Sequence, residues 1–142
     1  MEDGLHMIKV FYGKKGSGKT KAIVDSANRM SSEGTGDVVF IDDSNQLMYD
    51  LKHKIRFINV SDYPVAGHAA FTGFICGVIA EDFDIEGIFI DGLTYILKEK
   101  VENLKVFFDA LEQISSKFNV KFFLSINGDP GTVPEYLKEY LA

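Results

Sequence analysis

The feature that most constrains this chain is a glycine-rich octapeptide near the amino terminus, Gly13-Lys14-Lys15-Gly16-Ser17-Gly18-Lys19-Thr20. A β-branched and aromatic run at positions 8–12 precedes it and indicates a strand that ends at the first glycine. After it, apolar residues recur at helical spacing, which predicts a helix from about position 19. The order strand, glycine loop, helix is typical of an α/β fold with the loop at the carboxyl end of a strand.

The octapeptide also has the residue types and spacing of a phosphate-binding loop. Its glycines are expected to adopt backbone angles barred to other residues, so that the loop amides form a nest for phosphate oxygens. The start of the following helix adds a positive dipole end. Lys19 would then reach the β and γ phosphates, and the Thr20 hydroxyl would bind Mg²⁺. We predict that all eight residues, 13–20, bind the phosphates of a purine nucleoside triphosphate.

The rest of the chain alternates between segments that predict strands and segments that predict helices. Apolar runs with no polar face indicate strands buried on both sides, which is typical of a parallel sheet covered on two faces. The predicted strands are 38–41, 55–60, 88–90 and 120–126, and the predicted helices are 65–80, 102–118 and 135–141. Residues 31–36 read as a loop, and Thr132 with Glu135 as a capping box that opens the last helix. The expectation is a three-layer α/β fold with a mainly parallel sheet and helices on both faces.

Composition narrows the function classes. The 142 residues suit one domain, expected at 7–142, with residues 1–6 as an expression remnant, an upstream start or a disordered end. A formal net charge of −6 gives no strong signal for nucleic acid. The single cysteine, Cys76, excludes an internal disulfide framework and a zinc site, and it favours a reducing, cytoplasmic setting.

The segment Val65–Ala80 contains no charged residue. It is shorter than the roughly 17–25 residues that span a bilayer, so we expect a buried helix and no membrane span. Its large apolar residues, taken to face every direction, are Phe71, Phe74, Ile75, Val78 and Ile79. Two alternatives follow: the helix is surrounded within its own domain, or one side meets a second copy or another protein partner.

A second acidic position follows the apolar run at 88–90. Asp91 stands where a P-loop enzyme places the aspartate that holds Mg²⁺, usually through water. The alternative is a turn cap after a strand, a common role for aspartate. Thr20 and Asp91 are therefore the predicted magnesium residues.

The spacing of the phosphate loop, the strand with Asp91 and a later strand with a polar tip resembles the RecA-like (ASCE-type) P-loop ATPases, from Ile8 to Asn127. The resemblance implies a P-loop NTPase fold and a magnesium-dependent ATPase in which Lys19 is catalytic. Gly92 stands where a catalytic glutamate often follows the aspartate in this group. RecA-like members carry that glutamate after the strand that follows the first helix, where this chain has Asp42 and Asp43. These two aspartates are catalytic candidates, or they cap the next helix.

The same resemblance implies a sensor for the γ phosphate at Ser125 or Asn127, and the alternative for Asn127 is a turn-forming cluster. Lys14 resembles the signature lysine of MinD-like ATPases that dimerise over the nucleotide, or it is an exposed lysine that adds positive potential. Guanine-binding proteins recognise the base with an Asn-Lys-x-Asp stretch, and this chain has none, so ATP is favoured over GTP. We expect a slow ATPase or a non-hydrolysing ATP switch. A small-molecule kinase is less favoured, because such kinases usually carry a lid with several arginines and this chain has only two arginines.

Overall fold

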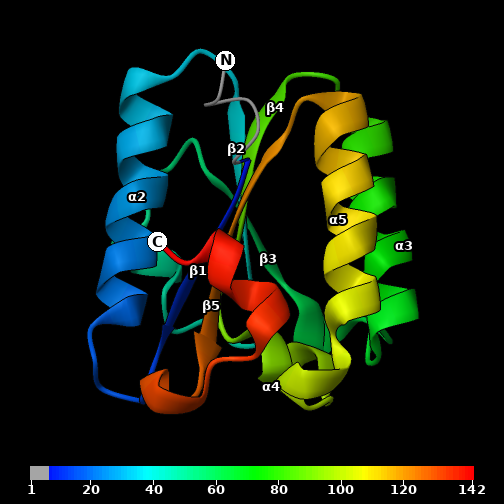
Figure 1. Cartoon of the computed structure of the whole chain (residues 1–142). Helices are drawn as coiled ribbons and strands as arrows, with labels where there is room; N and C mark the ends of the chain where they lie inside the picture. The colour runs from blue at the N-terminus through cyan, green and yellow to red at the C-terminus, as the bar shows by residue number, and fades with distance from the viewer. Residues whose placement is uncertain (1–6) are drawn as a thin grey trace.

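The computed structural model describes residues 7–142, and the expectation for residues 1–6 lies outside them (Figure 1). Within the described chain, five parallel strands form one sheet in the order β1-β5-β4-β2-β3. The strands are β1 (Ile8–Gly13), β2 (Asp37–Asp42), β3 (Arg56–Asn59), β4 (Ile85–Ile90) and β5 (Lys121–Asn127). The predicted α/β class and parallel sheet are therefore confirmed, and membership of the P-loop NTPase fold stays a prediction.

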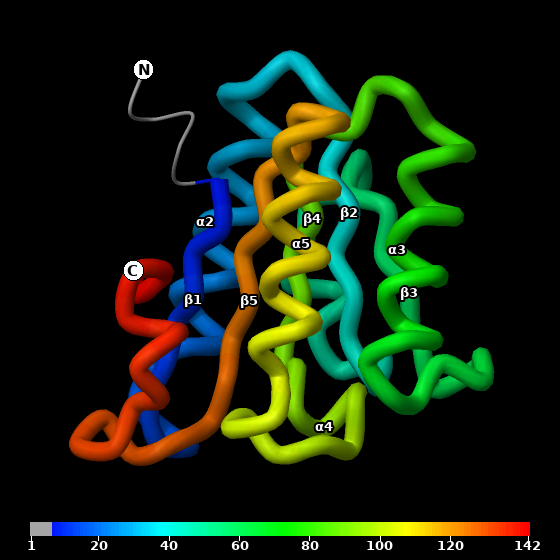
Figure 2. The backbone as a smooth tube through the Cα atoms, turned by 45° about the vertical axis from the view of Figure 1, so that its right-hand side comes forward, coloured from blue at the N-terminus to red at the C-terminus, as the bar shows by residue number. Residues whose placement is uncertain are grey.

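Helices cover both faces of the sheet. The α-helices are α2 (Lys19–Glu33), α3 (His68–Glu81), α4 (Leu93–Leu97) and α5 (Lys105–Phe118). Helix α2 lies against one face, and α3 and α5 lie side by side over the other (Figures 1 and 2). Each helix buries an apolar stripe, as the helical spacing of residues such as Ile23 and Ala27 predicts.

The central strands contribute to the core on both faces. In β4, Ile88 and Ile90 pack with α3 and α5, while Phe89 between them packs under α2. The Phe89 ring stacks on Phe40 of β2 and on Phe123 of β5, with centroids 6.3 and 4.5 Å apart. This explains the continuous apolar runs, because a strand covered on both sides has no polar face.

Helix α3 differs from the expectation for the uncharged segment. Phe71, Ile75 and Ile79 are buried, and Phe74 and Val78 pack against the same core. The prediction that these five residues face every direction is wrong, because the spacing i, i+3, i+4, i+7, i+8 places them on one side of a helix. The opposite side is exposed and carries small residues: Ala69, Ala70, Gly73, Cys76, Gly77 and Ala80. The helix is thus not surrounded, and binding of a second chain stays a prediction. In residues 7–142 no helix has the length and apolar character needed to cross a bilayer.

The ends of several elements also differ from prediction. Helix α2 continues through Glu33 into the predicted loop, and α5 begins at Lys105 after a short 3₁₀ turn. The capping box does not form, because the extended Pro134 keeps the preceding residue out of a helix. The last element is a 3₁₀ helix, Glu135–Tyr140, and the chain end then pairs with the outer edge of β1 (Figure 2). The Ala142 amide donates to the Val10 carbonyl at 2.9 Å.

Candidate functional site

The carboxyl ends of the parallel strands share one edge of the sheet, which is where α/β folds place their ligands (Figure 1). A cavity of about 610 Å³ lies there. Residues Lys15, Gly16, Gly18, Lys19 and Thr20 line it from the loop side. The predicted residues from the other strands line it too: Asp42, Asp43, Asp91, Ser125 and Asn127. The structure therefore brings together most of the residues that the sequence singles out, from four separate strand ends.

The glycine loop owes its shape to two positive backbone angles. Gly16 has φ 85° and Gly18 has φ 93°, a region that favours glycine. Gly13 serves differently, because a Cβ there would come within 2.8 Å of the Ser17 Oγ. The Ser17 amide donates to the Lys14 carbonyl at 3.1 Å and closes the turn. Special angles are thus confirmed for two of the three glycines, and close packing explains the third.

Helix α2 begins at the cavity with its amides free for a ligand. Its N-cap is Gly18, and within the described chain no side chain caps it and no acid lies in its first turn. The first N–H groups of a helix have no partner inside the helix, and they carry the positive end of the dipole. Thr20, in this first turn, is exposed to the cavity. This start of α2 is suited to an anion.

Lys19 lines the cavity and is influenced by the charge of Asp91. Its Nζ donates to the Lys14 carbonyl oxygen at 2.9 Å. Partial burial lowers the pKa of Lys19, and the nearby Asp91 carboxylate opposes this effect. Lys19 and Asp91 therefore act on one another electrostatically across the site.

Asp91 is held in place by its neighbours. Its backbone amide donates to the Ile41 carbonyl at 3.0 Å, and its Oδ1 accepts the Ser125 hydroxyl at 2.6 Å. The Gly92 amide donates to the Ser125 Oγ at 2.8 Å. Gly92 has φ 73° and ψ 49°, the left-handed region, where it forms the N-cap of α4. A glutamate at this position would be strained, which gives a physical reason for its absence.

The two aspartates after β2 have different surroundings. Asp42 is buried, with 5% of its surface exposed, and its Oδ1 accepts the Asp43 amide at 2.8 Å. Burial raises the pKa of Asp42 to about 7, the Asp43 amide opposes this, and the charge of Asp91 adds to it. Asp43 is exposed. Within residues 7–142, the next helical element after β2 is the short 3₁₀ helix Met48–Asp50, whose N-cap is Leu47 and which has no side-chain cap. The alternative that Asp42 or Asp43 caps the next helix is therefore wrong.

Asn127 and Tyr95 meet at the rim of the cavity. The Asn127 Nδ2 donates to the Tyr95 hydroxyl at 2.9 Å. Tyr95 comes from α4, and sequence reasoning did not find it or the lining residues Gln46 and Leu47. Helix α4 has five residues, too few for an apolar period to stand out in the sequence.

The donors at the site suit magnesium. Within residues 7–142, no group of three or more His, Cys, Asp or Glu side chains is placed to hold a metal on its own. The Thr20 hydroxyl and the Asp91 carboxylate are hard oxygen donors, which Mg²⁺ prefers in company with water and phosphate oxygens. Thr20 and Asp91 are therefore the residues of this cavity whose donors fit a magnesium ion.

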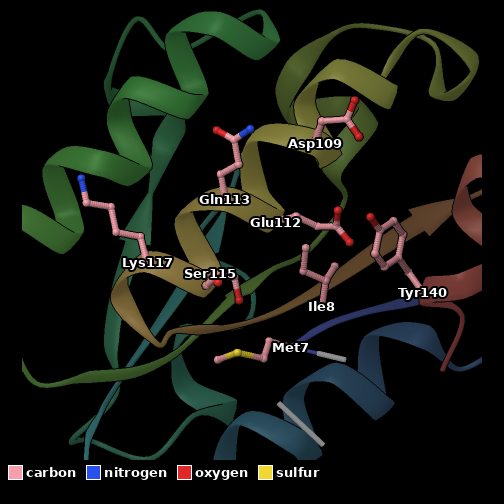
Figure 3. A pocket seen from close by; sticks show the side chains of 9 residues that line it. Met7, Ile8, Asp109, Glu112, Gln113, Ser115, Lys117 and Tyr140 are labelled. Carbon is pink, nitrogen blue, oxygen red and sulfur yellow. The ribbon is translucent and has the colours of Figure 1, made fainter. Parts of the chain in front are cut away.

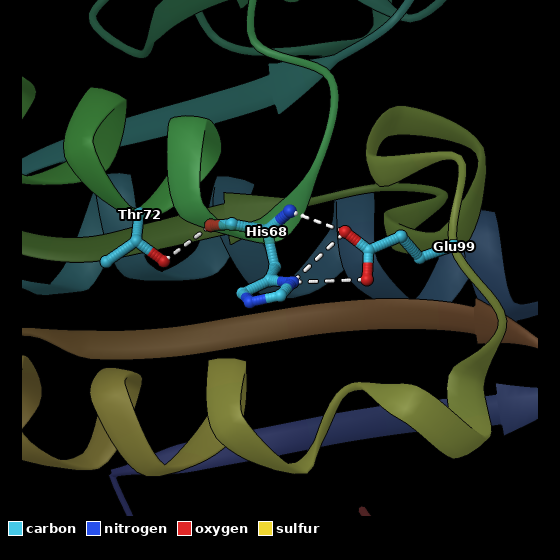
Figure 4. Close-up of polar contacts among 3 residues, drawn as sticks. All are labelled: His68, Thr72 and Glu99. Atoms are coloured by element: carbon cyan, nitrogen blue, oxygen red, sulfur yellow. Dashed lines mark hydrogen bonds and ion pairs between the residues drawn. The ribbon is translucent and has the colours of Figure 1, made fainter.

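Two other polar features lie away from this cavity. A cavity of about 740 Å³ between α5 and the start of β1 is lined by Asp109, Glu112 and Tyr140, among others (Figure 3). Its carboxylates make it a poor phosphate site. At the start of α3, the Glu99 carboxylate accepts the His68 amide at 2.7 Å and contacts the His68 ring at 3.1 Å (Figure 4). The hydrogen bond from the His68 amide, together with the ring contact, lowers the pKa of Glu99. These contacts join the segment after α4 to the start of α3.

Comparison with known proteins adds no family. No protein-family model matches the chain, and no curated protein matches its sequence.

Proposed function

We propose that the chain binds a magnesium–nucleoside triphosphate, ATP in preference to GTP, and hydrolyses it slowly as a RecA-like P-loop ATPase. The observation that supports this most is the convergence at one cavity of an uncapped helix start, a two-glycine turn, Lys19 and Asp91. A loop that only reversed the chain direction would need neither a lysine at the first helical position nor the carboxylates of Asp42 and Asp91 at the same cavity.

The residues divide the work by their chemistry. The phosphates accept hydrogen bonds from the loop amides, and Lys19 exchanges the Lys14 carbonyl for a phosphate oxygen. Thr20 and Asp91 would hold the magnesium ion, which would neutralise charge on the phosphates. Asp42, whose pKa is raised to about 7, is suited to accept a proton from an attacking water near neutral pH. Asp43 is exposed at the same cavity and is the second candidate for this step.

The alternative is an ATP-binding switch that does not hydrolyse. Gly92 supplies no carboxylate, and burial keeps much of the Asp42 population protonated at neutral pH. Both features favour slow turnover, well below the rates of about 10 per second that are typical of enzymes. A small-molecule kinase is less favoured, because the chain's two arginines, Arg29 and Arg56, are not among the residues that line the described cavity.

Calorimetric titration with magnesium–ATP tests the proposal. Lys19→Ala should weaken binding by about 10- to 100-fold, the size expected when a hydrogen bond to a charged group is lost. Lys105→Ala is the matched control, because Lys105 is likewise the first residue of its helix and lies outside the cavity. Circular dichroism should show that both variants are folded. Equal affinity of Lys19→Ala and the parent chain would refute this loop as the nucleotide site.

A further inference from the structure

Ser125 lies at the tip of β5, between the strand of the glycine loop and the strand that leads to Asp91. It is 3% exposed, so water has little access to its side chain. Its oxygen has two partners, the Gly92 amide at 2.8 Å and the Asp91 Oδ1 at 2.6 Å. These contacts join two strand ends that are far apart in the sequence.

The direction of both hydrogen bonds follows from the chemistry of the groups. The Gly92 N–H can only donate, so the Ser125 oxygen accepts there. The single hydroxyl hydrogen then goes to the carboxylate of Asp91, which accepts. A serine with its hydrogen committed in this way has no donor left for a phosphate.

The second oxygen of the Asp91 carboxylate has a different position in this network. In residues 7–142, Oδ1 is the carboxylate atom of Asp91 that receives a side-chain hydrogen bond, and the residue itself lines the cavity. Holding one oxygen limits rotation of the carboxylate and leaves Oδ2 for a cation or its water. A hydrogen bond between an O–H and an ionised oxygen is also among the stronger types in proteins.

We propose that Ser125 is a positioning residue that orients the Asp91 carboxylate for magnesium, and that it does not read the γ phosphate. The proposal rests on the proposed function, since it needs a magnesium–nucleotide at this cavity. It leaves Asn127 as the candidate for the sensor, because its amide lies at the rim, bonded to Tyr95.

The two roles of Ser125 predict different losses of affinity. A positioning residue should matter for ATP and ADP alike, but only when magnesium is present. A γ-phosphate sensor should matter for ATP and not for ADP, with or without magnesium. Partners that orient a metal ligand are typically worth 10- to 100-fold in metal affinity or activity.

The experiment measures calorimetric affinity for ATP and ADP, each in magnesium and in EDTA. Ser125→Ala should lose about 10- to 100-fold in magnesium for both nucleotides and change little in EDTA. Ser125→Thr keeps the hydroxyl and should restore most of the loss. In an Asp91→Asn background, Ser125→Ala should cause no further loss, because its partner charge is gone.

Other results of the same titrations distinguish a wrong role for Ser125 from a wrong proposed function. If Ser125→Ala weakens ATP alone, in both buffers, Ser125 is a sensor and the proposal is wrong. If its affinities match the parent in all four titrations, Ser125 has no role at the site. A parent chain that binds no nucleotide refutes the proposed function itself. Should Ser125→Ala unfold, Ser125→Cys replaces it, because a thiol is of similar size and a weak donor.

Discussion

The buried carboxyl of Asp42 should make the stability of the fold depend on pH, and Asp42→Asn should remove most of this dependence. In the unfolded chain the carboxyl titrates near its ordinary value of 3.8, and burial raises its pKa to about 7 in the folded protein. Between these two values the folded state binds more protons than the unfolded chain. The free energy of unfolding therefore falls as the pH rises through this window.

The size of the effect follows from the shift. A difference of about 3 pKa units corresponds to about 4 kcal/mol between full protonation and full ionisation of Asp42. From about pH 5.5 to pH 8 the carboxyl passes through the upper half of the window, which costs about 2 kcal/mol. An asparagine is neutral throughout, and its oxygen can still accept the Asp43 amide. At about pH 8 the free energy of unfolding of Asp42→Asn should therefore exceed that of the parent by up to about 4 kcal/mol.

Urea unfolding at the two pH values, followed by circular dichroism, measures this difference. Asp43→Asn is the matched control, because Asp43 is the adjacent exposed aspartate and its replacement leaves Asp42 in place. This control should lose stability with pH much as the parent does. If Asp42→Asn and the parent lose the same free energy between about pH 5.5 and 8, the carboxyl is ionised throughout and the reasoning fails.

Three further predictions concern the site and the exposed side of α3. Asp91→Asn should weaken ATP binding in magnesium and change it little in EDTA, and a similar loss in both buffers would assign Asp91 another role. If hydrolysis is detectable, alanine at Asp42 or Asp43 should slow phosphate release with binding intact, and undiminished turnover in both variants and in the double variant would remove the proposed base. If the chain self-associates through α3, Gly73→Glu should abolish the association seen in sedimentation. The new side chain enters open space, so it places a charge on the exposed side of α3 without a clash inside the domain. A parent chain that is monomeric at every concentration and nucleotide state would refute self-association.

Features with local causes could be predicted from the sequence. The strand, glycine loop and helix at positions 8–33 depend on neighbours a few residues apart, and Gly18, one of the two loop glycines with positive φ, lies at a glycine position of the motif. The apolar run at 88–90 predicts a buried strand because its side chains are apolar on both faces, and all three are fully buried. The carboxyl ends of parallel strands share one edge, so Asp91 and Asn127 are expected on the same side as the loop.

Tertiary structure decided what depends on the order and register of distant strands. The sequence shows Ser125 as a polar strand tip, but its partners, Asp91 and Gly92, follow from β5 lying beside β4. Asp42 and Asp43 are identical residues side by side, and their environments differ because the first is buried at the end of β2 and the second is exposed. Burial next to Asp91, which raises the pKa of Asp42, is set by the pairing of β2 with β4, and no pattern within β2 encodes that neighbour.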